Sequence, residues 1–136
     1  MDHTNLGKTG LKVSRLGFGL YELGTLEGKA GGDDAGRLLN VALDSGINFL
    51  DTAACYGNSE DFIGNAVGHR RSEYVLATKC GHVTDDSGGQ EWTAQTIRGN
   101  INHSLRRLKT DHLDIVQLHS CNVDVLERGE AIEELS

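Results

Sequence analysis

Positive charge is scarce in this sequence. It has 13 Lys and Arg residues against 20 Asp and Glu residues, which gives a formal net charge of −7 at pH 7. Nucleic acids and anionic membrane surfaces are bound through clustered positive charge, so this balance argues against both kinds of partner. We therefore expect small molecules to be the partners of this protein.

Long apolar runs are also lacking. No run approaches the roughly 20 residues that are needed to span a bilayer, and the N-terminus does not have the basic and then apolar layout of a signal peptide. The sequence therefore predicts a cytoplasmic protein without a membrane-spanning segment.

Cysteine is the third scarce feature, with Cys55, Cys80 and Cys121 alone. An odd number of thiols without close spacing fits reduced cysteines better than a disulfide framework. The remaining composition, 38% hydrophobic and 24% charged in 136 residues, is that of an ordinary globular protein. Because this length supports one hydrophobic core, we expect residues 1–136 to form a single domain or part of one.

Hydrophobic patterns and turn residues predict an alternation of strands and helices. Two short strands, at residues 5–7 and 11–14, flank Lys8-Thr9-Gly10 and predict a β-hairpin. Apolar runs then predict four strands, at residues 15–20, 47–51, 74–79 and 113–119. Helical periodicity between and after these strands predicts helices at residues 33–46, 59–68, 93–108 and 131–136.

Polar residues predict how these helices begin. Asp33 and Asp34 suit the positive end of the first helix, while Ser59 and Thr93 are the expected N-caps of the next two. A polar loop at residues 80–92 leads to the third helix. The basic side chains of that helix are expected to face solvent, namely Arg98, Arg106, Arg107 and Lys109.

The alternation decides the fold class. Strands and helices that alternate with short connections indicate a parallel sheet with right-handed crossovers, either open or closed into a barrel. If Asp51, Lys79 and His119 share one face, the period of two along a strand places further side chains in layers below them. Reactive groups above such layers are typical of the inside of a TIM (β/α)8 barrel, so we favour an α/β barrel. The layers are Phe49, Ala77 and Gln117, and then Ile47, Val75 and Ile115.

Three of the predicted strands end in a residue that can take part in proton chemistry. They finish at Asp51, Lys79 and His119, and Tyr56 follows Asp51 in the next loop. Each residue alone is better explained as an ordinary polar residue at a strand end. Three strands that end in the same manner favour a shared site at one edge of the sheet.

The four side chains complement one another chemically. A phenol has an ordinary pKa of about 10, too high for easy proton exchange near neutrality, and a neighbouring ammonium favours the phenolate. We expect Lys79 to supply that ammonium for Tyr56, and Asp51 to be the carboxylate that makes a buried Lys79 tolerable. His119 could hydrogen-bond a carbonyl oxygen or relay the proton. The set suits protonation of a carbonyl oxygen while another group supplies hydride.

The chain resembles the N-terminal half of an aldo-keto reductase. The resemblance covers essentially all 136 residues and implies a TIM barrel that interconverts carbonyls and alcohols with NADP(H) or NAD(H). The segments that match the family's pattern in order and spacing are Leu6-Gly7-Lys8-Thr9-Gly10-Leu11-Lys12-Val13-Ser14, Leu16-Gly17-Phe18-Gly19, Asp51-Thr52-Ala53-Ala54-Cys55-Tyr56-Gly57, Thr78-Lys79 and Leu118-His119.

The resemblance also implies a role for each site residue. Tyr56 would be the general acid, Lys79 and Asp51 the pair that favours its phenolate, and His119 the group that orients the carbonyl. Tyr56 and His119 would therefore touch the substrate, which could be a sugar or an aliphatic or aromatic carbonyl. The residues expected against the nicotinamide ribose are Gly19, Leu20 and Tyr21, through their backbone, together with Asp51.

Length is the main departure from the family. A closed barrel takes about 250 residues and eight strands, whereas this sequence predicts four strands and stops within its fourth helix. The other half would carry most of the cofactor contacts, so we expect the chain alone to bind NADPH weakly. A half barrel leaves sheet edges exposed, and such edges favour self-association.

Two other interpretations stay open. The chain could be a catalytically inactive fragment, or an interaction module, that keeps the four residues by descent alone. A zinc site is also conceivable, although the spacings are unusual for zinc ligands and Lys79 would repel a cation. Its ligands would come from Cys55, Cys80, His82, His119 and Cys121.

Overall fold

The computed structural model describes residues 1–84 and 89–136, which form an α/β structure around a parallel sheet. The predicted order of parallel strands is confirmed, although the first strand is shorter than residues 15–20. The strands lie side by side in chain order: β3 (Phe18–Gly19), β4 (Phe49–Asp51), β5 (Val75–Cys80) and β6 (Ile115–Leu118).

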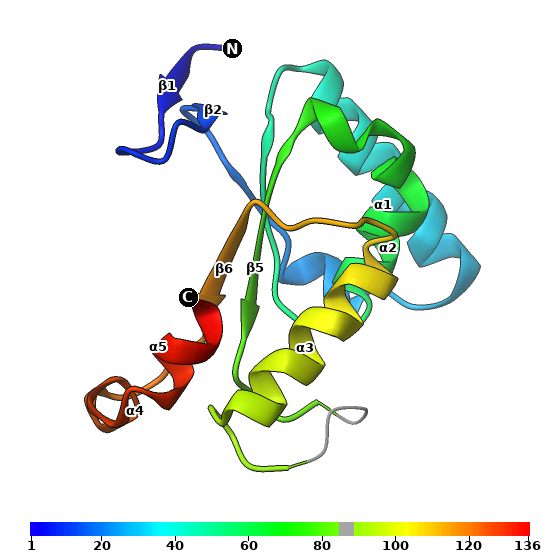
Figure 1. Cartoon of the computed structure of the whole chain (residues 1–136). Coiled ribbons are helices and arrows are strands. Elements are labelled where there is room, and N and C mark those ends of the chain that lie inside the picture. The colour runs from blue at the N-terminus through cyan, green and yellow to red at the C-terminus, as the bar shows by residue number, and fades with distance from the viewer. Residues whose placement is uncertain (85–88) are drawn as a thin grey trace.

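The predicted hairpin precedes the sheet. β1 (His3–Asn5) and β2 (Lys12–Ser14) pair in antiparallel fashion. Asn48 joins the hairpin to the start of β4, because its Oδ1 accepts from the Ser14 N–H at 2.6 Å and its Nδ2 donates to the Lys12 oxygen at 3.0 Å. The hairpin therefore lies at the amino ends of the strands (Figure 1).

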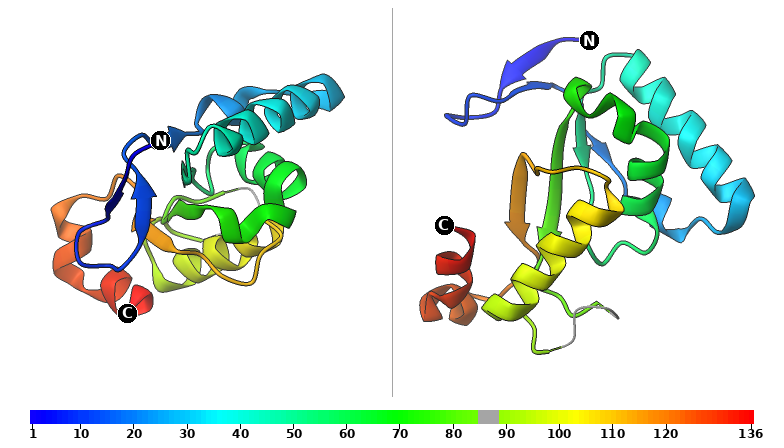
Figure 2. Two further views of the ribbon diagram at one scale, coloured as in Figure 1. Left: turned by 90° about the horizontal axis from the view of Figure 1, so that it is seen from above. Right: turned by 45° about the vertical axis from the view of Figure 1, so that its right-hand side comes forward.

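Helices cover one face of the sheet. Figures 1 and 2 show α1 (Gly28–Asp44), α2 (Ser59–Val67) and α3 (Ala94–Arg107) on the same side. The 3-10 segments η1 (Glu22–Thr25) and η2 (Gly68–Glu73) precede α1 and follow α2. After β6 come α4 (Val123–Arg128) and α5 (Glu130–Leu135), and α5 packs against α3. None of the helices in the described ranges is long and apolar enough to cross a membrane.

α1 begins at Gly28, so the predicted start at Asp33 is wrong. The glycine-rich stretch is helical because it packs against α2, where a Cβ added to Gly32 would lie 3.4 Å from the Phe62 ring. Tertiary packing of this kind outweighs the poor intrinsic helix propensity of glycine. The predicted end is confirmed, since Gly46 has a φ of +86°.

Ser59 is not the N-cap of α2, as the sequence had predicted. The residue before the helix is Asn58, and the buried Ser59 hydroxyl donates instead to the Leu20 oxygen at 2.9 Å. Ser59 Oγ also lies 2.9 Å from Thr52 Oγ1. This hydroxyl therefore connects the start of α2 to the chain just beyond β3 and β4.

The other N-cap prediction is confirmed. Thr93 Oγ1 accepts a hydrogen bond from the Thr96 N–H at 3.3 Å at the start of α3. α4 was not predicted. It begins after Asn122, whose side chain accepts from the Val125 N–H, and ends at Arg128, before Gly129 with its φ of +79°. Of the predicted loop at residues 80–92, residues 85–88 lie outside the described residues.

Two hydrophobic clusters hold the helices to the sheet. The larger one lies under α1 and α2 and contains the fully buried Leu50 and Leu76 of β4 and β5. The smaller one joins Ile97 of α3 to Cys80 of β5 and to α4 and α5. Leu50 alternates along β4 with the half-buried Phe49 and Asp51 of the opposite face, whereas Leu76 is flanked by the buried Val75 and Ala77. The opposite face of β5 is partly exposed only at Lys79, near the carboxyl end of the strand.

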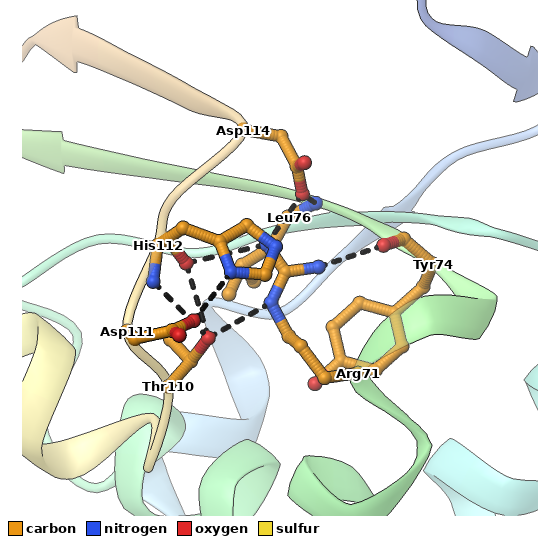
Figure 3. A network of polar contacts seen from close by, with 7 residues as sticks. All are labelled: Arg71, Tyr74, Leu76, Thr110, Asp111, His112 and Asp114. Carbon is orange, nitrogen blue, oxygen red and sulfur yellow. Dashed lines mark hydrogen bonds and ion pairs between the residues drawn. The ribbon is translucent and has the colours of Figure 1, made fainter.

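Arg71 links the amino ends of β5 and β6 (Figure 3). Its side chain is 13% exposed, and its guanidinium pairs with Asp114 at 2.6 Å. Asp114 in turn accepts from the Leu76 N–H at 2.7 Å. This network fixes the end of the sheet that lies opposite the predicted site. The further acceptors of Arg71 are Thr110 Oγ1 and the backbone oxygens of Tyr74 and His112.

Candidate active site

An ion pair links the carboxyl ends of β4 and β5. Lys79 Nζ donates to both oxygens of Asp51, at 2.9 and 2.8 Å, and to the Thr52 backbone oxygen at 2.9 Å. The Lys79 side chain is 14% exposed and that of Asp51 is 36% exposed. Three acceptors around one ammonium make up for much of the water that it loses on burial. The sequence predicted this pair, and the structure brings the two residues together.

Tyr56 lies over this ion pair. A tight turn after β4 carries it, in which the Tyr56 N–H donates to the Ala53 oxygen at 3.0 Å. Lys79 Nζ lies 5.0 Å from the centre of the Tyr56 ring, which is the distance of a cation–π contact. Among the described residues the Tyr56 hydroxyl has no hydrogen-bond partner, so it is available to another molecule.

His119 follows β6 and completes the group. The backbone N–H of His119 donates to the Cys80 backbone oxygen at 2.9 Å, and the backbone oxygen of His119 accepts from Trp92 Nε1 at 2.9 Å. These contacts place the imidazole 5.5 Å from the Tyr56 ring, measured between ring centres. Asp51, Tyr56, Lys79 and His119 therefore meet at one edge of the sheet.

The surroundings of His119 keep it neutral. Burial lowers the pKa of the imidazole most, and the nearby His82 and Lys79 lower it further, against the opposite pull of Asp51. The His82 and His119 ring centres are 4.9 Å apart. A neutral imidazole has one nitrogen that donates and one that accepts a hydrogen bond.

The residues that we expected to contact the cofactor differ in how exposed they are. Gly19 pairs with Asp51 in the sheet register, and Tyr21 is 59% exposed with its ring edge-on to Tyr56 at 5.1 Å. Leu20 is 1% exposed and packs in the larger hydrophobic cluster. Its N–H donates to the Asp51 oxygen, and its oxygen accepts from Ser59, so its backbone is already hydrogen-bonded.

Arg107 does not face solvent, which corrects the sequence prediction. Its side chain is 14% exposed and donates to Asp61 at 2.9 Å and to the Ala54 oxygen at 3.2 Å. It also donates to the backbone oxygen of Gly57. Arg107 therefore holds the chain on both sides of Tyr56.

Gly24 holds the same turn from the opposite side. A Cβ added there would lie 2.0 Å from the Tyr56 oxygen, so only glycine permits this approach of η1. The Asn58 N–H donates to the Gly24 oxygen at 3.3 Å. Sequence reasoning missed this contact, since a glycine among many carries no sign of which one meets another backbone.

Cys55 and Gln117 also border the site. Cys55 Sγ lies 3.2 Å from His119 Nδ1, and Gln117 Nε2 donates to Asp51 Oδ1 at 3.5 Å. The period of two along the strand had placed Gln117 on this face, but no pattern pointed to the thiol as a partner of His119.

The structure gives no support to a zinc site. Within residues 1–84 and 89–136, no group of three or more His, Cys, Asp or Glu side chains is arranged to hold a metal ion. Cys80 is buried in the smaller hydrophobic cluster, where burial raises the pKa of its thiol to about 11. A thiol with that pKa is a poor metal ligand at neutral pH.

Comparisons with known proteins agree with one another. Residues 15–136 match the model of the Aldo/keto reductase family. L-galactose dehydrogenase of Arabidopsis thaliana is 40% identical over 128 residues, which cover 90% of this chain and 39% of that protein. A crystal structure of a putative aldo-keto reductase from Pseudomonas aeruginosa has a TM-score of 0.85 at 36% identity and covers 98% of this chain and 53% of its own.

A solved aldo-keto reductase from Bacillus halodurans, in its holo form, has a TM-score of 0.85 at 37% identity and covers 98% of this chain and 45% of its own. The chain spans less than half the length of its curated relatives, 39% of the Arabidopsis protein and 45% of an uncharacterized oxidoreductase of Bacillus subtilis.

Proposed function

The chain belongs to the aldo/keto reductase family, and from this we propose that it carries the proton-transfer site of an NAD(P)H-dependent oxidoreductase that interconverts carbonyls and alcohols. The observation that carries the proposal is the convergence of Tyr56 on the Lys79–Asp51 ion pair, with His119 beside it. A phenol over an ammonium is suited to giving a proton to an oxygen on which negative charge develops.

In the proposed reaction, Tyr56 donates its hydroxyl proton to the carbonyl oxygen. The Lys79 ammonium, 5.0 Å from the ring centre, stabilises the negative charge that the phenolate then carries. Asp51 is the counter-ion of the Lys79 ammonium in its largely buried position, and so offsets the cost of burying that charge. In the reverse direction, the same phenolate accepts the proton of an alcohol.

His119 has a separate role in this proposal. As a neutral imidazole it can donate one hydrogen bond to the carbonyl oxygen and so fix the direction in which the substrate lies. It does not compete with Tyr56 as a proton donor, because its lowered pKa leaves little imidazolium at neutral pH.

The residues at the end of β3 fit a nicotinamide nucleotide. A Cβ added to Gly19 would meet no atom within 4 Å, so open space lies over the strand end beside Asp51. The Tyr21 ring, two residues further along the chain, is exposed and packs edge-on against Tyr56. We propose that Gly19, Tyr21 and Asp51 hold the cofactor on this side, whereas Leu20 is buried in the larger hydrophobic cluster and supports the strand end from below. The bound cofactor would supply or accept the hydride.

We further propose that residues 1–136 form the N-terminal half of a barrel. Among the described strands, β3 and β6 each have a single neighbour, so both edges of the sheet are open. Leu38 and Val41, which are 48% and 62% exposed, lie on the flank of α1 that faces away from α2. In a closed barrel, another helix would cover that flank.

Reduction of carbonyls by the purified chain tests the proposed function. The assay follows oxidation of NADPH or NADH with an aldehyde, a ketone and a sugar, the last because one relative is named L-galactose dehydrogenase. We expect Tyr56→Phe to lower kcat/KM by about 10²- to 10⁴-fold, the usual contribution of a general acid. The matched control is Tyr74→Phe at the other end of the sheet, which removes a buried hydroxyl that has no hydrogen-bond partner within residues 1–84 and 89–136.

A Tyr56→Phe variant as active as the wild type would contradict the assignment of the general acid. No reduction by the wild-type chain would favour the second candidate, a catalytically inactive chain that acts through its surface. The open edges of β3 and β6 are the observation that favours this candidate, because they can pair with another protein.

A further inference from the structure

Cys55 has a contact that the proposed reaction does not use. It directly precedes Tyr56 in the turn after β4, and its Sγ lies 3.2 Å from Nδ1 of His119, at the end of β6. A sulfur and a ring nitrogen at this distance are within reach of a hydrogen bond. The contact therefore joins the loop of the proposed general acid to the residue that would orient the carbonyl.

The other neighbours of His119 fix its position and leave Nδ1 of its ring to the thiol. Cys80 and Trp92 bind its backbone, while the rings of Tyr56 and His82 pack edge-on against the imidazole. Among the described residues, the Cys55 thiol is the side-chain group within hydrogen-bond distance of His119 Nδ1. Its effect on the ring is therefore not shared with another hydrogen-bonding group.

The direction of this hydrogen bond depends on the charge states of its partners and on which of them is the better acceptor. Burial raises the pKa of the Cys55 thiol, against smaller opposing effects of its backbone hydrogen bond and of Lys79, so sulfur keeps its proton at neutral pH. The pKa of His119 is lowered, so the ring is neutral. Between these neutral groups the thiol is the favoured donor, because sulfur is a weak acceptor whereas an unprotonated imidazole nitrogen is a good one. This direction requires that Nδ1 lacks a proton. In a neutral imidazole the other nitrogen, Nε2, then carries the proton.

We propose that Cys55 is a positioning residue that donates its S–H to Nδ1 of His119 and thereby holds the imidazole in the Nε2–H tautomer. Nε2 lies across the ring from the thiol and is the nitrogen that remains to donate to a carbonyl oxygen. The catalytic consequence rests on the proposed function, whereas the tautomer does not. Cys55 itself takes no part as a nucleophile, because the reactive form of cysteine is the thiolate.

The tautomer can be measured directly. Long-range proton–nitrogen correlation spectra of the full chain, with isotope-labelled histidine, report which ring nitrogen of each histidine carries the proton. We expect His119 to have a bare Nδ1 and a protonated Nε2 at neutral pH, and His119→Gln assigns its signals. A proton on Nδ1 of His119 in the wild type would overturn the proposal without the need for any cysteine variant.

Substitutions then test whether the thiol is the cause. Cys55→Ala should shift His119 toward the Nδ1–H tautomer, while Cys55→Ser should keep Nε2–H, because a hydroxyl can also donate to Nδ1. Cys121→Ala is the matched control, since it removes a cysteine of the same segment as His119 and should change nothing. An unchanged His119 tautomer in Cys55→Ala would overturn the proposal.

Kinetics separate this inference from the function on which it draws. With a carbonyl substrate, Cys55→Ala should lower kcat/KM by about three- to tenfold, the worth of one neutral hydrogen bond, while Cys55→Ser restores it and the Kd of NADPH is unchanged. If the tautomer responds as expected but no variant reduces carbonyls, the proposed function fails and the positioning role of Cys55 stands. Equal kcat/KM in Cys55→Ala and wild type, in an active protein, would overturn the catalytic consequence.

Discussion

Glu60 is a carboxyl group with no exposed surface, between α2 and α3. Its Oε1 accepts from Thr78 Oγ1 at 2.7 Å, whereas its Oε2 has no hydrogen-bond partner among the described residues and lies 3.6 Å from Arg107 Nη1. Burial raises the pKa of Glu60 above 4.5, against the smaller opposing effects of its hydrogen bonds and of Arg107. The folded chain therefore holds this proton more tightly than the unfolded chain does.

The raised pKa of Glu60 predicts a pH-dependent stability. Between 4.5 and the raised value, the folded state binds more protons at Glu60 than the unfolded state, so its contribution to stability falls as the pH rises through this window. A Glu60→Gln variant does not titrate, so its stability relative to wild type should increase with pH over the same window. Urea unfolding at a series of pH values measures this difference.

Glu73 provides a control of opposite sign. Hydrogen bonds from Arg70 lower the pKa of this exposed carboxyl, so its contribution is present above 4.5 and is lost as the pH falls. Glu73→Gln should therefore lose stability relative to wild type as the pH rises. The same trend with pH in both variants would refute the account of Glu60.

Individual side chains differ in how far the sequence could predict them. Asp51 and Lys79 were predictable because they end neighbouring parallel strands, where the period of two fixes the face that each presents. The contacts of Cys55 and Arg107 were not predicted: Cys55 was considered only as a zinc ligand and Arg107 was expected to face solvent. Their partners His119 and Gly57 are distant in sequence and are brought close only by the tertiary fold.

The turn between β4 and α2 is the element on which the proposed site depends. Arg107 of α3 donates to the Ala54 and Gly57 oxygens, and Gly24 of η1 packs directly on the Tyr56 backbone. The turn itself is too short to have a core of its own. Its conformation is therefore imposed by two other elements.

Removing the Arg107 guanidinium should loosen this turn. In Arg107→Gln, the Ala54 and Gly57 oxygens lose their donor, which we expect to lower the free energy of unfolding by about 1–3 kcal/mol. Amide hydrogen exchange in residues 54–58 should become faster than in the strands of the sheet. Thermal unfolding and hydrogen exchange read by mass spectrometry measure the two effects.

Arg106→Gln is the matched control for this prediction. Arg106 is exposed on the same last turn of α3, so its replacement should change stability by less than about 0.5 kcal/mol. Unaltered exchange in residues 54–58 of Arg107→Gln would mean that Gly24 alone holds the turn.

Whole helices and strands could be predicted where their apolar positions repeat with a regular helical or strand period. α3 and β5 were predicted close to their observed bounds for this reason. The start of α1 was not, because its glycines have poor helix propensity and are helical only through packing on α2. α4 has six residues, which is too short a segment to show helical periodicity.

At the scale of the molecule, the described chain leaves apolar and hydrogen-bonding surface without a partner. The edges of β3 and β6 are open, and the α1 flank around Leu38 and Val41 is exposed. The order of strands and helices could be predicted because each element alternates with the next. The degree to which the sheet closes could not be predicted, because closing a barrel takes more strands than the four that the described residues contain.

We expect the chain to self-associate through these surfaces. Size-exclusion chromatography with light scattering at micromolar concentrations should give an apparent mass that rises with concentration. Val41→Lys, on the exposed flank, should weaken the association, whereas Lys29→Gln, near the start of α1, should leave it unchanged. A mass of 14.7 kDa at every concentration would contradict this expectation.

The position of the β1–β2 hairpin has a practical consequence. It carries the N-terminus at the amino ends of the strands, and Asn48 fixes it there, while the proposed site opens at the carboxyl ends (Figure 1). A tether attached before Met1, such as a biotin on a sensor chip, would orient the molecules with their reactive rim toward the flowing solution. Weak cofactor affinities could then be measured on an immobilised layer without blocking the surface that binds.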